Sequence, residues 1–277
     1  MKKIFLLFTL ILFSCSTESD TNTTECIDYI DLTYGSDSNQ KIDLYLPAGR
    51  NSGTPLLIIV HGGGWAGGDK SEGGNWPKGI SQNNMAVANV NYRLVDGVSI
   101  TWHDQIEDIN SIVNFLQNKS EDYIFSSDKI IMMGQSAGAH LSLLYSHKYD
   151  KTGRIKAVIS LAGPVDLTSD QLKTYLTSKG IVLSQVFPDT TQESEASPVK
   201  HCRNLPTLFM HGKIDDVVPY KQSEDMYTLM NTKNYICSII LFEDTGHSVV
   251  SNDSDPSVNR FYEVNTAILN WIKKYSE

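Results

Sequence analysis

Residues 129–145 read Lys-Ile-Ile-Met-Met-Gly-Gln-Ser-Ala-Gly-Ala-His-Leu-Ser-Leu-Leu-Tyr. The opening apolar run is typical of a buried strand, and the closing run is typical of a packed helix. Between them stands the pattern Gly-x-Ser-x-Gly, which predicts a sharp turn with Ser136 at its apex. A Cβ at Gly134 or Gly138 would collide with neighbouring backbone in so tight a turn. Such a turn exposes a strained serine hydroxyl, although a glycine-rich turn without chemistry has the same sequence.

A second glycine motif follows another apolar run. Residues 55–60 (Pro-Leu-Leu-Ile-Ile-Val) show no alternation, as expected of a strand buried on both faces. They lead directly into residues 61–65, His-Gly-Gly-Gly-Trp. Consecutive glycines can bring bare backbone N–H groups up to a developing negative charge, although a merely flexible loop is also glycine-rich. Two such motifs, each at a strand end, indicate a site more strongly than either does alone.

Further strands and helices alternate along the chain. Alternating polarity predicts an antiparallel edge pair at 26–34 and 41–46, and apolar runs predict strands at 86–91, 154–161, 206–210 and 236–242. Helical periodicity marks 104–117, 220–231 and 258–272. This order predicts an α/β fold with a mostly parallel sheet of about eight strands and helices on both faces. Ligands bind at the carboxyl ends of such strands, which is where both glycine motifs lie.

The chain resembles the carboxylesterases of the α/β-hydrolase fold. The resemblance rests on four motifs in order: His-Gly-Gly-Gly-Trp (61–65), Asn-Tyr-Arg-Leu (91–94), Gln-Ile-Glu-Asp (105–108) and Gly-Gln-Ser-Ala-Gly (134–138). Among these enzymes the chain is most similar to acetyl esterases, acetylxylan and feruloyl esterases and hormone-sensitive-lipase-like enzymes. The resemblance implies one α/β-hydrolase domain over residues 26–277, with residues 168–198 as a short cap that leaves the pocket open on one side.

The resemblance also implies a catalytic triad of Ser136, Asp215 and His247, in the family's chain order Ser, Asp, His. His247 follows the last predicted strand in a Gly-His turn, and Asp215 fits the pattern His-Gly-x-x-Asp-x-x-Val-Pro. Asp166, after an earlier strand, remains an alternative acid. Asp216 is then expected to serve the turn or the start of the following helix.

Around this triad the resemblance implies an oxyanion hole and a substrate-binding side chain. The expected oxyanion donors are the N–H groups of Gly63, Gly64 and Ala137. Trp65 is expected to border the substrate pocket, with Trp76 or Trp102 as further candidates. The remaining histidines are expected to be structural: His61 braces its loop, His140 packs on its helix, and His147 and His201 lie at the surface.

These residues predict hydrolysis of a carboxylic ester through an acyl-enzyme, without a metal or an organic cofactor. The expected substrates are small-molecule or glycan esters with short-chain or aromatic acyl groups. An amidase, arylformamidase or peptidase would have the same triad, and a non-catalytic binding protein on this scaffold is a third reading. The net charge of -9 argues against nucleic acid as a partner. The oligomeric state is left open.

The N-terminus reads as a targeting segment. Two lysines precede a short apolar stretch that ends at Cys15, as in a bacterial lipoprotein signal over residues 1–15. The mainly polar residues 16–25 would be a tether. This predicts an exported protein anchored to the membrane through lipid on Cys15, at the periplasmic or cell surface, although an ordinary secretory signal is the alternative. A disulfide between Cys202 and Cys237 is a further open possibility.

Overall fold

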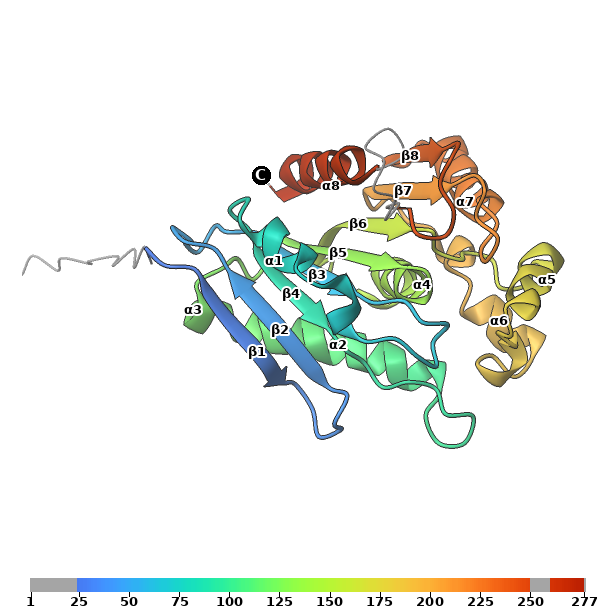
Figure 1. Ribbon diagram of the computed structural model, residues 1–277, viewed down its shortest axis with the longest axis horizontal. Coiled ribbons are helices and arrows are strands. Elements are labelled where there is room, and N and C mark those ends of the chain that lie inside the picture. Colours follow the sequence, from blue (N-terminus) through green and yellow to red (C-terminus); the bar gives the residue numbers. More distant parts are fainter. Residues whose placement is uncertain (1–23, 250–259, 277) are drawn as a thin grey trace, which may run out of the picture.

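The chain folds around one sheet of eight strands in the order β1-β2-β4-β3-β5-β6-β7-β8 (Figure 1). The coordinates are a computed structural model and describe residues 24–249 and 260–276. β1 pairs antiparallel with β2 and β2 antiparallel with β4, whereas the other neighbours are parallel. The strands are β1 (Ile27–Thr33), β2 (Lys41–Leu46), β3 (Leu56–Val60), β4 (Ala86–Val90), β5 (Ile130–Gln135), β6 (Ile155–Leu161), β7 (Thr207–Gly212) and β8 (Cys237–Phe242). The predicted α/β-hydrolase architecture is confirmed.

Helices cover both faces of this sheet. The helices are α1 (Trp76–Ser81), α2 (Trp102–Asn118), α3 (Ser120–Tyr123), α4 (Ala137–Leu144), α5 (Asp170–Ser178), α6 (Thr190–Glu195), α7 (Lys221–Thr232) and α8 (Phe261–Ser276). Apolar side chains of α2, α4 and α7 share one core cluster with one face of the sheet, and those of α1 and α8 share a second cluster with the other. Short 3₁₀ turns at Lys70–Gly73, Leu183–Gln185 and Pro198–His201 and a π-helical turn at Tyr145–Tyr149 join these elements.

The central strand β5 shows why its sequence is apolar without alternation. Ile130 and Met132 belong to the cluster under α2 and α4, whereas Ile131 and Met133 belong to the cluster under α1 and α8. Because successive side chains of a strand point to opposite faces, a strand covered on both sides must be apolar at every position. The strand is therefore buried from Ile130 to Gly134, and only its last residue, Gln135, is exposed before the chain reaches Ser136 at the carboxyl edge of the sheet.

The predicted cap region, residues 168–198, contains α5, a 3₁₀ turn and α6. These elements lie beyond the carboxyl ends of the central strands in Figure 1. After α5 the chain reverses at Gly180, whose φ of 76° is a left-handed conformation that suits glycine at a helix end. The reversal brings Ile181 against the loop after β3, where its Cδ1 lies 3.3 Å from the point that a Cβ on Gly64 would occupy.

Several expectations concern other parts of the chain. Cys15 and tether residues 16–23 lie outside the described residues, as does the predicted start of the last helix at residue 258. Cys202 and Cys237 are both free thiols, so the bridge considered from sequence is absent. Within the described part of the chain, no helix combines the length and the hydropathy needed to cross a bilayer.

Candidate active site

The turn between β5 and α4 has the strained geometry that its sequence predicts. Ser136 has φ 52° and ψ -122°, and its N–H donates to the carbonyl of Leu161 on β6 at 2.9 Å. A Cβ on Gly134 would lie 2.3 Å from the Gly138 backbone, and one on Gly138 would lie 2.2 Å from the Val60 carbonyl. Only glycine lets the helix pass this close to two strands. The close approach fixes Ser136, whose side chain is partly exposed, above the end of β5.

A continuous chain of hydrogen bonds joins three of the predicted site residues. The Ser136 hydroxyl lies 2.9 Å from His247 Nε2, and His247 Nδ1 donates to Asp215 Oδ2 at 2.8 Å. The His247 side chain is 22% exposed, so a substrate can reach it, whereas the Asp215 side chain is fully buried. The geometry orients one imidazole nitrogen toward the hydroxyl and the other toward a carboxylate.

Asp215 is held as a carboxylate by donors on every side. Its Oδ1 accepts the N–H groups of Val217 at 2.8 Å and Val218 at 2.9 Å. Burial alone would raise the pKa of Asp215, but hydrogen bonds from His211 and His247 outweigh burial and hold this pKa well below its usual range. The group is therefore ionised at neutral pH and can stabilise a protonated imidazole.

His211 is a site residue to which sequence reasoning gave no role. Its Nε2 lies 3.0 Å from Asp215 Oδ2 and 2.9 Å from the carbonyl of Val218, and Ser223 Oγ lies 2.8 Å from its Nδ1. Because both neighbours of Nε2 are acceptors, this nitrogen donates to them. His211 thus holds the Asp215 oxygen that also accepts from His247, whereas Val217 holds the other oxygen. The sequence feature that could have indicated this role is the histidine that begins the His-Gly-x-x-Asp pattern, which lies at the buried end of β7.

Asp216 and Asp166, the other two carboxylates considered from sequence, interact with other residues. The Asp216 side chain is 72% exposed and forms an ion pair with Lys179 after α5. Asp166 accepts the N–H of Thr168 at 3.0 Å and its hydroxyl at 2.6 Å, as the cap of a local turn. His247 Nδ1 is directed to Asp215, so the structure favours Asp215 over both alternatives.

The glycine loop after β3 approaches the serine closely. Gly63 and Gly64 have φ of 111° and 59°, and a Cβ on Gly63 would lie 2.1 Å from the Gly67 carbonyl. A Cβ on Gly62 would lie 3.3 Å from Ser136 Cβ, which shows how closely the loop approaches the elbow. The N–H of Ala137 is at the first turn of α4, where helix N–H groups have no intrahelical acceptor. The role of the Gly63, Gly64 and Ala137 N–H groups as oxyanion donors stays a prediction.

His61 braces this loop, as its sequence position suggested. Its Nδ1 donates to the Gly62 carbonyl at 2.7 Å, and its ring stacks on Tyr92 with 4.4 Å between centroids. The Tyr92 hydroxyl also donates to the His61 carbonyl at 3.0 Å. The ring therefore supports the loop backbone.

Trp65 does not border an open pocket, which corrects the prediction of a substrate-binding face at this residue. Its side chain is 1% exposed, and its Nε1 donates to His140 Nδ1 at 3.1 Å. Phe187 of the cap packs edge-on against the indole at 5.3 Å. Burial lowers the pKa of His140 to about 4, so the neutral ring can accept from Trp65 while its Nε2 donates to Ala196. Trp65 therefore connects the glycine loop after β3 with α4 and with the cap.

His147 was expected at the surface, and this expectation is wrong. The side chain is buried, its Nε2 lies 3.2 Å from Thr207 Oγ1, and the N–H of Arg203 donates to its Nδ1 at 3.3 Å. Trp102 is likewise fully buried, whereas Trp76 is partly buried and lines a cavity. His140 packs on its helix as expected.

The family model BD-FAE matches residues 42–230, more than half of the chain. The chain belongs to the BD-FAE family. The matched range contains Ser136 and Asp215 together with both glycine motifs, and His247 follows it. The assignment agrees with the α/β-hydrolase esterases that the sequence resembles.

Relatives of this BD-FAE chain include esterases and a formamidase. It is 27% identical over 243 residues to the probable isoprenylcysteine alpha-carbonyl methylesterase ICMEL1 of Arabidopsis thaliana, covering 78% of this chain and 50% of the plant protein. The chain thus spans about half the length of that relative. It is 25% identical over 264 residues to the kynurenine formamidase of Danio rerio, covering 93% and 86% of the two chains.

Solved structures of esterases share the fold of this BD-FAE chain. A truncated carbohydrate esterase from gut microbiota superposes with a TM-score of 0.73 at 17% identity, over 92% of this chain and 98% of that one. At this level of identity the likeness concerns the fold.

Proposed function

We propose that the protein is a serine carboxylic-ester hydrolase in which Ser136 is the nucleophile. The observation that carries the proposal is the hydrogen-bonded series from Ser136 through His247 to Asp215, with distances of 2.9 and 2.8 Å. His247 accepts the proton of the attacking hydroxyl, and Asp215 stabilises the resulting imidazolium and its orientation. The esterases among the relatives and structural neighbours support the same reaction class.

The reaction proceeds through two tetrahedral intermediates. The N–H groups of Gly63, Gly64 and Ala137 donate to the oxyanion that forms on the carbonyl oxygen. His247 then returns its proton to the leaving alcohol, which leaves an acyl-enzyme on Ser136. Water, deprotonated by His247, attacks the acyl-enzyme and releases the acid. Hydrolysis of p-nitrophenyl acetate by the purified protein tests the proposal, and an inactive protein would contradict it.

A second candidate is hydrolysis of an amide or formamide bond by the same residues. The similarity to a kynurenine formamidase over 93% of the chain favours it as the alternative. The two functions differ in the leaving group, since an amine must be protonated by His247 before it leaves. Comparison of p-nitrophenyl acetate with p-nitroacetanilide separates them, and acetylated xylan and methyl ferulate test whether carbohydrate or aromatic acyl esters are substrates.

The cap supports short acyl groups as the preferred substrates. Ile181 lies against Gly64, and Lys179, two residues earlier, pairs with Asp216 beside the acid. Residues 179–181 therefore extend from the loop that carries Asp215 to the glycine loop after β3. An acyl group whose carbonyl lies at the Gly64 N–H has little room to extend past this turn.

Replacement of Ile181 by alanine should relax this limit. The unchanged enzyme is expected to prefer p-nitrophenyl acetate to butyrate over octanoate. Ile181→Ala should raise the octanoate-to-acetate ratio of kcat/KM by about tenfold, since room for two methylenes at about 0.8 kcal/mol each is worth that much. Val182→Ala, at the neighbouring exposed position, is the control. An unchanged ratio in Ile181→Ala, or wild-type activity that rises steadily to decanoate, contradicts this limit.

We further propose that the protein is exported and anchored through a lipid on Cys15. The basis is the basic and apolar N-terminal sequence that ends at this cysteine and the polar stretch after it. Cys15→Ser should move the enzyme from the membrane fraction to the soluble fraction, with the same specific activity once soluble. Fractionation that does not change argues for a conventional signal or another attachment.

A further inference from the structure

The glycine loop after β3 has an unusual backbone at three successive residues. Gly63, Gly64 and Trp65 have φ of 111°, 59° and 64°. Glycine adopts such values readily, but for a tryptophan they are an outlier, because a bulky side chain disfavours the left-handed region. An outlier of this kind persists only where the surrounding structure fixes it. The conformation of the two glycines, which are proposed oxyanion donors, therefore depends on the contacts that hold Trp65.

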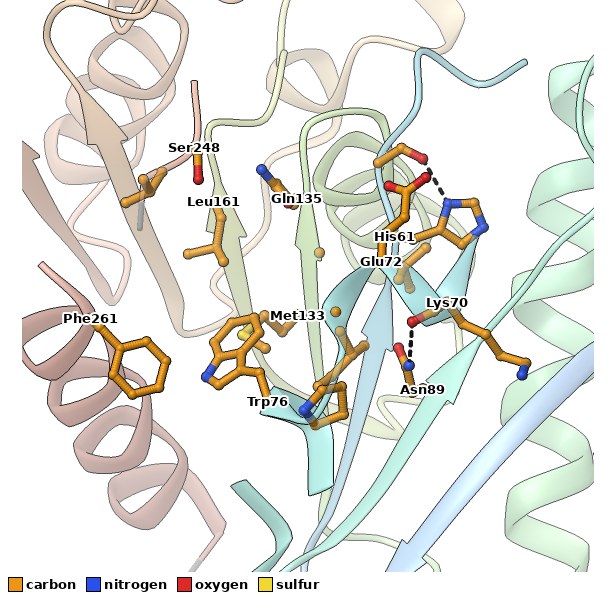
Figure 2. Close-up of a pocket in the computed structure, with 17 residues that line it drawn as sticks. His61, Lys70, Glu72, Trp76, Asn89, Met133, Gln135, Leu161, Ser248 and Phe261 are labelled. Carbon is orange, nitrogen blue, oxygen red and sulfur yellow. Dashed lines mark hydrogen bonds between the residues drawn. The ribbon is translucent and has the colours of Figure 1, made fainter. Parts of the chain in front are cut away.

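The backbone of this loop is held by hydrogen bonds on both sides of the two glycines. Gln105 Nε2 donates to the Trp65 carbonyl at 2.7 Å, and the N–H of Val95 donates to the same carbonyl at 3.0 Å. The Gln105 side chain is fully buried. Before the glycine pair, His61 Nδ1 donates to the Gly62 carbonyl at 2.7 Å (Figure 2). The loop is thus anchored at its start and at Trp65.

The indole of Trp65 connects the two halves of the proposed oxyanion hole. Its Nε1 donates to His140 Nδ1 at 3.1 Å. His140 lies one turn into α4, and its N–H donates to the Ser136 carbonyl at 3.0 Å. The same turn of α4 begins with Ala137, whose N–H is the remaining proposed donor. This side-chain hydrogen bond therefore relates the position of the glycine loop to that of the helix that carries Ala137.

The cap packs on this hydrogen bond from outside. His140 Nε2 donates to the Ala196 carbonyl at 2.8 Å. Phe187 packs edge-on against both rings, with centroid distances of 5.3 Å to Trp65 and 5.7 Å to His140. All three side chains are buried, so a hydrogen bond that is broken here is not replaced by one to water.

We propose that Trp65 is a positioning residue, which through His140 and the cap fixes the separation between the glycine loop and Ala137 that the oxyanion requires. The inference rests on the proposed ester hydrolysis and on the proposed role of these N–H groups. Oxyanion donors bind the transition state more strongly than the substrate, and a misplacement of about 1 Å can cost about 100-fold in rate. Loss of the Trp65 contacts should therefore lower kcat and leave KM unchanged.

The first test removes the indole N–H. Trp65→Phe keeps a ring at this position but cannot donate to His140, and it should lower kcat for p-nitrophenyl acetate about tenfold, with KM within about twofold. Trp102→Phe is the matched control. Trp102 is also fully buried, packs against the same Phe187 at 5.9 Å and donates its indole N–H to Gln192 of the cap, but it lies on α2. Its kcat should stay within about twofold of the unchanged protein.

Variants of the acceptor test the same hydrogen bond from the other side. His140→Leu removes both ring nitrogens and should lower kcat about tenfold or more. His140→Asn should recover part of this loss, because its side-chain oxygen can take the position of Nδ1. The double variant Trp65→Phe/His140→Leu should lose little more than His140→Leu alone, since both changes remove the same hydrogen bond.

A transition-state analogue provides a readout that a merely structural role would not move. Ser136 Oγ adds to the carbonyl carbon of a trifluoromethyl ketone, the serine proton passes to His247, and the carbonyl oxygen becomes the oxyanion. Across these variants the inhibition constant should rise by the same factor as kcat falls. Circular dichroism and thermal unfolding identify the variants that are folded.

The outcomes separate this proposal from the proposed hydrolysis. A kcat within about twofold of the unchanged protein in folded Trp65→Phe and His140→Leu overturns the positioning role alone. A rise in KM at constant kcat does the same, since Trp65 would then act on substrate binding. An equal loss in Trp102→Phe also overturns it, because the effect would then come from the cap as a whole. An unchanged protein that hydrolyses no ester overturns the proposed hydrolysis, and this proposal with it.

Discussion

Ser136→Ala is expected to lower kcat for p-nitrophenyl acetate by roughly 10⁵- to 10⁶-fold, because every covalent step passes through its hydroxyl. His247→Ala should cost a similar factor. The double variant should lose little more than either single variant, since the nucleophile and its base act as one unit at 2.9 Å. Losses that multiply would contradict a shared mechanism.

The same variant provides a direct chemical test of the nucleophile. A fluorophosphonate probe should label the unchanged protein at Ser136 and leave Ser136→Ala unlabelled. Ser142→Ala is a suitable control, because Ser142 is a buried serine on the same helix whose hydroxyl has no hydrogen-bond partner among the described residues. Failure to label an active preparation would rule out Ser136, and a protein inactive on every ester would support the binding-protein reading.

Asp215→Asn is expected to lower kcat by roughly 10³- to 10⁴-fold. An amide at this position can donate to His247 Nδ1, which would place the imidazole proton on Nε2 and leave no acceptor for the serine hydroxyl. Asp216→Asn should have little effect, since its carboxylate is 72% exposed and pairs with Lys179. Steady-state kinetics on p-nitrophenyl acetate measures all of these variants.

Asp166, the alternative acid, provides the control for the Asp215 prediction. Asp166→Asn should alter only the local turn at Thr168, where its carboxylate accepts two hydrogen bonds. If Asp166→Asn proves more damaging than Asp215→Asn, the acid belongs to the loop after β6.

The strands and the elbow could be predicted because their causes are local in sequence. A strand covered on both faces must be apolar throughout, and residues 130–133 are. The elbow needs glycine two residues before and after Ser136, and the sequence has both. Once the order of strands was known, the motifs at their carboxyl ends had to meet at one edge of the sheet.

The residues whose surroundings were predicted wrongly are buried by side chains that are distant in sequence. Trp65 is buried because Phe187 of the cap and His140 of α4 cover it. His147 is buried by Thr207 and Arg203, which no periodicity around His147 reveals. The cavity that Trp76 lines is likewise formed by residues of α1, α8 and the sheet that are distant in sequence, so Trp76 gave no local signal of it.

The order of the catalytic groups along the chain has a consequence for biosynthesis. Ser136 precedes His247 by 111 residues, and His247 follows the outermost strand, β8. A nascent chain that has emerged from the ribosome as far as β7 holds the nucleophile and the glycine loop but lacks the base. It cannot deprotonate Ser136 by this route, whatever its partial fold. On the proposed mechanism, hydrolytic competence therefore arises only when the last strand, β8, has joined the sheet and brought His247 to Ser136.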